Sequence, residues 1–151
     1  VGEMKIEITN LTNENCDQNR IISLAQFAMS RMQLHPDCEL SISLVAEPEM
    51  SALHIQWMDE EGPTDVLSFP MDEIRPKSRA QGPGMLGDVI LCPDFAAKQA
   101  LEAGHSLQEE LELLTVHGIL HLLGFDHREA KEKMEMFSLQ DSYLAEWRKG
   151  A

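Results

Sequence analysis

Hydrophobic and polar residues alternate in two stretches of the first third of the chain, residues 4–8 and 40–45. A period of two is typical of strands with one buried face, so both stretches predict β-strands. Between them, residues 19–34 carry apolar side chains at helical spacing, which predicts an amphipathic helix. We expect His35 and Pro36 to end this helix, because the residue before a proline disfavours the α region.

Short strands and helices follow in the rest of the chain. Ser106 and Glu109 have the spacing of a capping box, which predicts the start of a helix. The prolines and glycines of residues 71–84 predict a long mobile loop. The other predicted elements are helix 47–58, strand 66–69 ending at Pro70, strand 86–91, a helix from Pro93 or Asp94 to residue 103, helix 106–123 and helix 128–147. This order predicts an α+β fold: a single domain over residues 1–151, with a small mixed four-stranded sheet packed with helices.

Composition and charge limit the classes of protein to which this chain can belong. A length of 151 residues suits one domain, and 43% hydrophobic and 25% charged residues are ordinary for a globular protein. The apolar runs are too short for a transmembrane segment, and the start of the chain lacks the pattern of a secretory signal. Three widely spaced cysteines fit the reduced thiols of a cytosolic protein. A net charge of -14 argues against broad electrostatic binding of nucleic acid, so such a function needs local basic patches or a partner.

The strongest chemical signal is a group of three histidines, His117, His121 and His127. Residues four apart on a helix lie about 40° apart and about 6 Å along its axis, so the first two imidazoles can converge on one ion. Gly124 suits a turn that brings His127 to the same ion, and Asp126 could hold an imidazole by its second nitrogen. Three nitrogen ligands with a fourth position open predict one catalytic Zn²⁺ ion. The other three histidines are isolated in the sequence, and we expect surface, cap or core roles for His35, His54 and His105.

The histidine spacing matches the metallopeptidase pattern H-E-x-x-H-x-x-G-x-x-H except at one position. Gly118 stands where that pattern has a glutamate, the group that takes a proton from the metal-bound water. The peptidase interpretation therefore loses its general base. A metal held there could still polarise a substrate, so the sequence favours a metal-dependent hydrolase of another kind.

Residues 117–127, His-Gly-x-x-His-Leu-x-Gly-Phe-Asp-His, resemble the signature of the YbeY family of bacterial endoribonucleases. Pro-Thr-Asp-Val-Leu-Ser-Phe-Pro at residues 63–70 and Leu-Gly-Asp-Val-Ile-Leu at residues 86–91 are similar to two further motifs of that family. The resemblance implies a zincin-like domain and a zinc-dependent, single-strand-specific endoribonuclease that acts in 16S rRNA 3′-end maturation and ribosome quality control. It further implies a cytoplasmic protein that works with the small ribosomal subunit, its proteins and an Era-like GTPase.

One departure from the family pattern concerns the substrate. Many members carry an arginine shortly before the Pro-Thr-Asp segment, whereas residues 55–61 contain none. Either another cation makes the phosphate contact or RNA binding is weaker. The candidate cations are Arg75, Lys77 and Arg79 in the long loop, and the alternative is that this loop is simply solvated. Asp65 and Asp88 lie in the matched motifs, where each could orient a histidine, cap a turn or act as base, with structural roles favoured. Two alternatives stay open, a zinc metallopeptidase-like hydrolase and a non-catalytic ribosome-assembly factor with structural zinc.

Overall fold

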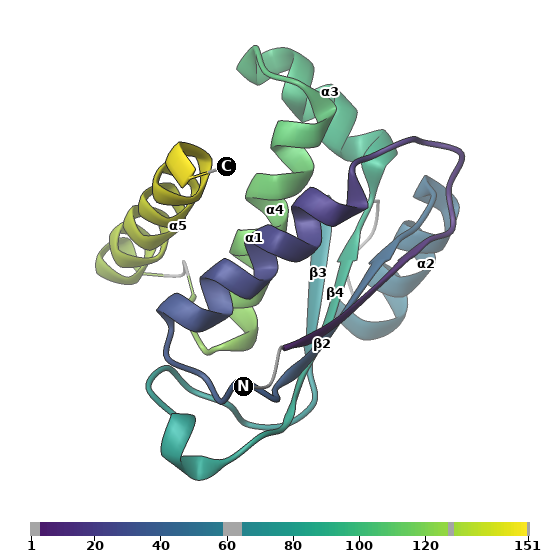
Figure 1. Ribbon diagram of the computed structural model, residues 1–151. Coiled ribbons are helices and arrows are strands. Elements are labelled where there is room, and N and C mark those ends of the chain that lie inside the picture. The colour runs from purple at the N-terminus through teal and green to yellow at the C-terminus, as the bar shows by residue number, and fades with distance from the viewer. Residues whose placement is uncertain (1–3, 59–64, 127–128, 151) are drawn as a thin grey trace.

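The computed structural model describes residues 4–58, 65–126 and 129–150, and Figure 1 shows the arrangement of the elements. Strands and helices alternate in the first two thirds, and three helices in a row end the chain. The elements in order are β1 (Lys5–Asn10), α1 (Gln18–Arg31), β2 (Glu39–Leu44), α2 (Glu47–Met58), β3 (Val66–Pro70), the 3-10 helix η1 (Arg79–Gln81), β4 (Met85–Leu91), α3 (Pro93–Ala103), α4 (Leu107–Leu122) and α5 (Ala130–Gly150). No helix of the described residues is long and apolar enough to cross a membrane.

The strands form one mixed sheet in the order β1-β2-β4-β3. β1, β2 and β4 run parallel, and β3 pairs antiparallel with β4, so that Val66 lies opposite Leu91. The predicted α+β fold with a mixed four-stranded sheet is confirmed. β3 and β4 carry the two strand motifs of the sequence, and their pairing sets those motifs side by side at one end of the sheet order.

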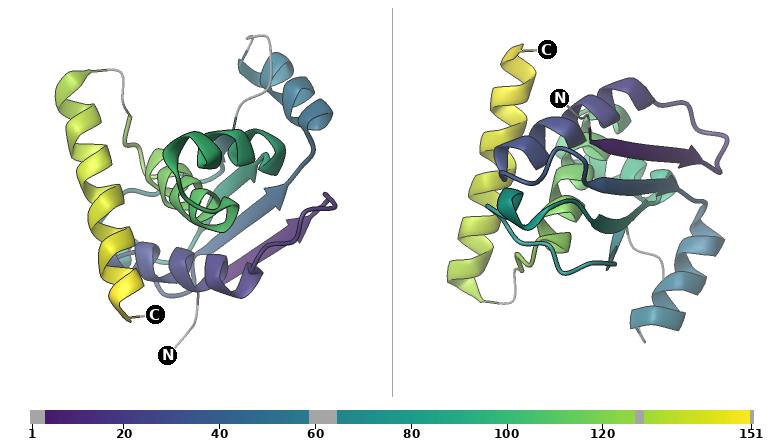
Figure 2. Two further views of the ribbon diagram at one scale, coloured as in Figure 1. Left: turned by 90° about the horizontal axis from the view of Figure 1, so that it is seen from above. Right: turned by 60° about the horizontal axis from the view of Figure 1, so that its bottom comes forward.

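Helices cover the two faces of the sheet unequally (Figures 1 and 2). α1 and α4 pack on one face, and α5 packs against both of them on the side away from the strands. The main hydrophobic core lies between this helical layer and the sheet. On the other side, α2 packs against β3 and β4 through a smaller cluster that includes Met50, Leu67 and Ile90. The thicker helical side therefore holds most of the buried surface, and α4 lies at its centre.

The start of α4 is fixed by the predicted capping box. The Ser106 hydroxyl accepts a hydrogen bond from the Glu109 amide, and the Glu109 carboxylate accepts one from the Ser106 amide, both at 3.1 Å. The Ser106 amide and hydroxyl both donate to the Glu109 carboxylate, and these two hydrogen bonds lower the pKa of Glu109. α4 contacts α1, α3, α5, β3 and β4, so most of its circumference is buried. The side chains of α4 are therefore held in place by the helices and strands packed around it.

The end of α1 differs from the prediction. The helix stops at Arg31 and not at the proline, because Gln33 adopts a left-handed conformation with φ of 59°. The Leu34 amide then donates to the Met29 carbonyl at 3.3 Å, the long hydrogen bond of a Schellman motif. Pro36 follows in the next turn. Glycine is the usual residue at this position, so a glutamine there is no direct sign of the turn.

The loop between β3 and β4 follows the predicted irregular course, but it is fastened at several points. Ile74 and Ser78 are buried. The Lys77 amide donates to the Met32 carbonyl at the end of α1 at 2.8 Å, and the Asp72 carboxylate accepts from the Met85 amide at 2.7 Å. These contacts hold the β3–β4 loop against the end of α1, and thereby set the position of its basic residues.

Candidate metal and substrate site

His117 and His121 come together on α4. Their ring centroids lie 4.8 Å apart with the ring planes at 74°, and both side chains are half-buried on a helix that is otherwise mostly enclosed. The predicted third ligand, His127, lies outside the described residues. Within the described ranges no three His, Cys, Asp or Glu side chains form a group that could hold a metal. The structure thus brings two of the three predicted ligands together, and the role of the third stays a prediction.

Gln140 of α5 contacts the first histidine of the pair. Its Oε1 lies 2.9 Å from Nδ1 of His117, and Gln140 is buried. An amide oxygen only accepts hydrogen bonds, so this contact requires a proton on Nδ1, and in a neutral imidazole the lone pair is then on Nε2. A hydrogen bond of this kind orients imidazoles that bind metals. Gln140 was not singled out from the sequence, although it interrupts the buried face of α5 formed by Met136, Tyr143, Leu144 and Trp147.

Gly118 faces the sheet. A Cβ atom at this position would lie 2.8 Å from Cγ1 of Val89 and 3.3 Å from Oγ of Ser68. The Ser68 hydroxyl also donates to the Gly118 carbonyl at 3.1 Å. Glycine lets α4 approach β3 and β4 this closely, so a side chain at position 118 would collide with the strands before it could reach a metal. This contact joins the histidine motif to the two strand motifs, since Ser68 belongs to one and Val89 to the other.

Asp88 lies on the other face of the sheet. Because Val89 faces α4, its neighbours on β4 point away from the helix. Asp88 lines an open pocket of about 430 Å³ with Leu53, Phe69 and Ile90, beneath α2. A role in orienting His117 or His121, or as a base beside them, is therefore wrong for Asp88. For Asp65 the described contact is structural, since its carbonyl accepts the Cys92 amide at 2.9 Å. The predicted role of Asp126 stays a prediction.

The basic residues of the β3–β4 loop separate in the structure. The guanidinium of Arg75 lies against Gly124, where a Cβ atom would be 3.2 Å from Cζ and Nη1. Gly124 has φ of 99°, and its amide donates to the His121 carbonyl at the end of α4. Lys77 and Arg79 are exposed, and the backbone of Lys77 is tied to the end of α1. Among the contacts of the described residues, only that of Arg75 joins one of the three candidates to the histidine motif.

An aromatic ring and a lysine adjoin the histidine pair from α5. The Phe137 ring lies 5.8 Å from the His117 ring between centroids, at an interplanar angle of 33°. The ammonium of Lys133 lies 5.9 Å from the centre of the Phe137 ring, within the range of a cation–π contact. Both residues belong to the first half of α5, which approaches α4 near its C-terminal end (Figure 1). Lys133 thus brings a second positive charge into the neighbourhood of His117.

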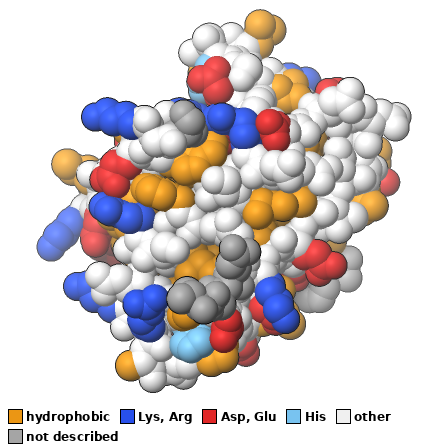
Figure 3. All heavy atoms as spheres, in the orientation of Figure 1, with side chains coloured by type: hydrophobic (Ala, Val, Ile, Leu, Met, Phe, Trp, Pro, Cys, Tyr) orange, Lys and Arg blue, Asp and Glu red, His pale blue; other side chains and the backbone are white. Residues whose placement is uncertain are grey.

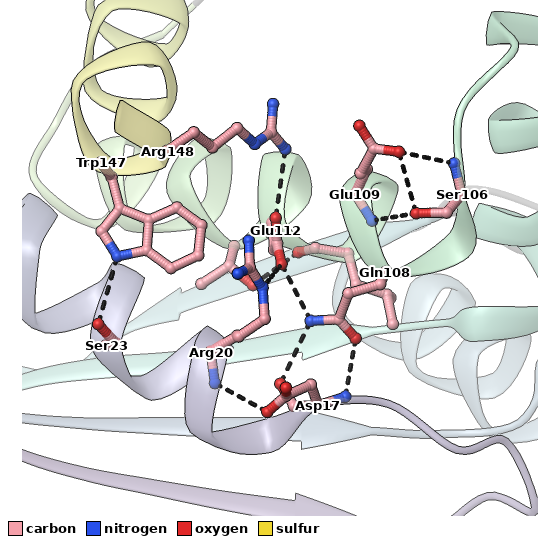
Figure 4. A network of polar contacts seen from close by, with 11 residues as sticks. Asp17, Arg20, Ser23, Ser106, Gln108, Glu109, Glu112, Trp147 and Arg148 are labelled. Carbon is pink, nitrogen blue, oxygen red and sulfur yellow. Dashed lines mark hydrogen bonds and ion pairs between the residues drawn. The ribbon is translucent and has the colours of Figure 1, made fainter. Parts of the chain in front are cut away.

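A network of polar contacts ties α1, α4 and α5 together toward the other end of α4 (Figure 4). The buried carboxylate of Glu112 pairs with Arg20 at 2.9 Å and with Arg148 at 3.3 Å, and Gln108 donates to it at 3.1 Å. The Arg20 guanidinium lies 4.6 Å above the ring of Trp147. The hydrogen bond to Glu112 raises the pKa of Arg20. This network fixes how α5 lies along α4, and hence where Gln140 meets His117.

The isolated histidines have the modest roles expected of them. Nδ1 of His35 accepts the Asp37 amide at 3.0 Å in a turn, and Nε2 of His105 lies 2.5 Å from the Glu110 carboxylate before the first turn of α4. The side chain of His54 lies outside the described residues. Neither described residue reaches the pair on α4, which leaves His117 and His121 as the chemical centre of the described chain.

Three comparisons with known proteins agree. The family model described as Endoribonuclease YbeY matches residues 5–148. Proteins named Endoribonuclease YbeY from Rhodococcus erythropolis and Thermobifida fusca are 55% and 53% identical to the chain over 148 residues; these matches cover 95% and 97% of the chain and 82% and 96% of the relatives. The solution structure of TM1509 from Thermotoga maritima is similar with a TM-score of 0.63 and 29% identity, covering 96% of this chain and 93% of that one.

Proposed function

Because the chain belongs to the Endoribonuclease YbeY family of nucleases, we propose that it is a zinc-dependent endoribonuclease that cleaves single-stranded RNA. The family match over residues 5–148 supports the nuclease activity, and the contact of Gln140 with His117 is the observation that carries the metal site. The whole chain acts as one hydrolase domain. Its finer role is 16S rRNA 3′-end maturation and ribosome quality control in the cytoplasm, beside the small ribosomal subunit and an Era-like GTPase.

The donor set of the site fits zinc. His117, His121 and His127 would hold the ion, and neutral imidazole is a preferred ligand of Zn²⁺. The Gln140 contact supports this assignment, since it keeps the proton at Nδ1 of His117 and leaves Nε2 as the ligating nitrogen. The buried amide of Gln140 orients this ring without adding a negative charge of its own, which suits an anionic substrate such as a phosphodiester.

The mechanism follows from what the described residues supply. Zinc held by the three imidazoles would provide a Lewis acid that polarises a phosphodiester oxygen. Gly118 offers no carboxylate, and its contact with Val89 excludes one from that position. RNA carries its own nucleophile, the 2′-hydroxyl beside the scissile phosphate, so a missing protein base costs less than it does in peptide hydrolysis. The same contact at Gly118 speaks against the metallopeptidase alternative.

A direct test combines metal analysis with RNA cleavage. His117→Ala and His121→Ala proteins should lose zinc and the cleavage of a labelled single-stranded RNA together, and a chelator should stop the wild-type protein. His105→Gln is the matched control, because His105 lies before the first turn of α4, at the opposite end of that helix from His117, and glutamine keeps a donor for Glu110. Full cleavage by a metal-free double variant would refute the proposal.

The same preparations separate the alternatives. Chelator-sensitive cleavage of casein without cleavage of RNA would support the metallopeptidase. A wild-type protein that holds zinc tightly, with four protein ligands and no exchangeable water, and cleaves neither substrate would support the assembly factor with structural zinc.

A further inference from the structure

Positive charge is unevenly distributed over this acidic chain. Of 12 Lys and Arg residues, three lie in the β3–β4 loop and four on α5. Figure 3 shows one face of the molecule in the orientation of Figure 1. Lys and Arg side chains gather at the left of this face, on the side where Figure 1 draws α5, the end of α1 and the β3–β4 loop. Two of these cations contact neighbours of the histidine pair from two different segments: Arg75 lies against Gly124, and Lys133 lies over the ring of Phe137, which adjoins His117. A net charge of -14 thus leaves cations where a polyanion would have to enter.

Arg75 lies over the turn between two predicted ligands. Its Cζ and Nη1 would be 3.2 Å from a Cβ atom at Gly124, three residues after His121 and three before His127. Any side chain at position 124 would displace the guanidinium, so this glycine provides the surface on which Arg75 rests. The planar fork of arginine suits two oxygens of one phosphate, which a lysine at this position could not match.

The present partner of Arg75 is easily exchanged. Its Nη2 pairs with the Glu73 carboxylate at 3.1 Å, but the side chains are 54% and 81% exposed. Exposed pairs of this kind contribute little, because water and salt screen them. A phosphate oxygen can therefore replace the Glu73 carboxylate without leaving a buried charge unpaired.

Among the described residues, Lys133 contacts an aromatic ring and forms no ion pair with an acid. Its ammonium lies 5.9 Å from the Phe137 ring centre, and that ring lies 5.8 Å from the ring of His117. The contact restrains an exposed side chain in the neighbourhood of the site while its donors stay available to a ligand.

We propose that Arg75 and Lys133 bind two backbone phosphates of the RNA strand at the histidine site, and this inference rests on the proposed function. Contacts with phosphates position a strand without reading its bases, so they suit single strands of varied sequence. Arg75 takes one phosphate beside the Gly124 turn, and Lys133 takes another near Phe137. Glu73 opposes binding, because its carboxylate competes with the first phosphate.

The test measures binding of a labelled single-stranded RNA to the zinc-loaded protein by fluorescence anisotropy at several salt concentrations. The RNA carries 2′-O-methyl groups, which block cleavage through the 2′-hydroxyl. Arg75→Gln and Lys133→Gln should each weaken binding by roughly three- to tenfold and reduce the slope of log K against log [salt] by about 0.7. Glu73→Gln should strengthen binding. Lys98→Gln, on the exposed surface of α3, is the matched control and should leave both quantities unchanged.

The competing explanation for Arg75 is structural, since a cation near the C-terminal end of α4 also stabilises the helix. The proposal would be overturned by an Arg75→Gln protein that has a lower unfolding midpoint but binds RNA with the same slope of log K against log [salt] as the wild type. It would also be overturned by Arg75→Gln and Lys133→Gln proteins that bind as Lys98→Gln does, while the wild type binds and cleaves RNA. A wild-type protein that binds no RNA would overturn the proposed function as well.

Discussion

Replacing Gly118 by alanine tests the close approach of α4 to the sheet. A methyl group at this position would lie 2.8 Å from Cγ1 and 3.1 Å from Cγ2 of Val89, whose side chain is buried and too short to move aside. Alanine gains about 1 kcal/mol of helix propensity over glycine. Overpacking of a core costs about 1–3 kcal/mol. We therefore expect a net loss of about 1 kcal/mol, which corresponds to a fall of about 2–4 °C in Tm for a chain of this length.

Chemical denaturation followed by circular dichroism measures this loss. The matched control is Gly150→Ala at the end of α5, where an added Cβ atom meets nothing within 4 Å and stability should not fall. Val89→Ala removes both contacted methyl groups, so Gly118→Ala should cost less in its presence, with a coupling of about 1 kcal/mol. A Gly118→Ala protein that is more stable than the wild type, with no coupling to Val89→Ala, would refute the close contact.

Other predictions concern the surroundings of the site. Gln140→Leu should weaken zinc binding about 10- to 100-fold in a chelator competition, because it removes the hydrogen bond at the first histidine; unchanged affinity would contradict the orienting role. Replacing Arg20 and Arg148 together by methionine should lower the free energy of unfolding, measured in urea, by about 3 kcal/mol, because it leaves the buried Glu112 carboxylate without its ion pairs. Glu112→Gln should cost less, because the arginines it leaves unpaired are 40% and 38% exposed, whereas the carboxylate is only 1% exposed. The reverse order of the two losses would contradict this reasoning. The pKa of Glu109 is lowered by hydrogen bonds from the N-cap residue, so its carboxylate stabilises the fold above the ordinary Glu pKa and this stabilisation is lost as the pH falls through the lowered value. The difference in unfolding free energy between wild type and Glu109→Gln should therefore shrink as the pH is lowered, and a difference independent of pH would contradict the assignment.

The predictions from sequence were most successful where a short stretch determines its own structure. The capping box at Ser106, helix Glu47–Met58 and the strand of Val66 all depend on residues near one another in the chain. The end of α1 was placed too late, because Gln33 adopts a conformation for which its type gives no direct sign.

The histidine spacing likewise predicted which side chains meet, since one helix carries both His117 and His121. Gln140 was not predicted, because its partner lies 23 residues away and only the docking of two helices brings them together. Asp88 illustrates the opposite case, in which a residue in a matched motif lies on the wrong face of the sheet.

The two contacts between α4 and α5 have a consequence for shortened forms of the protein. Gln140 meets His117, and eight residues later Arg148 meets Glu112, so α5 is held at two points along an antiparallel partner. The last helix thus contributes to the site although it bears none of the predicted ligands. A chain cut before Ala130 would keep the whole histidine motif yet lose the group that orients its first ring. A fragment that carries the signature would therefore still lack the assembled site.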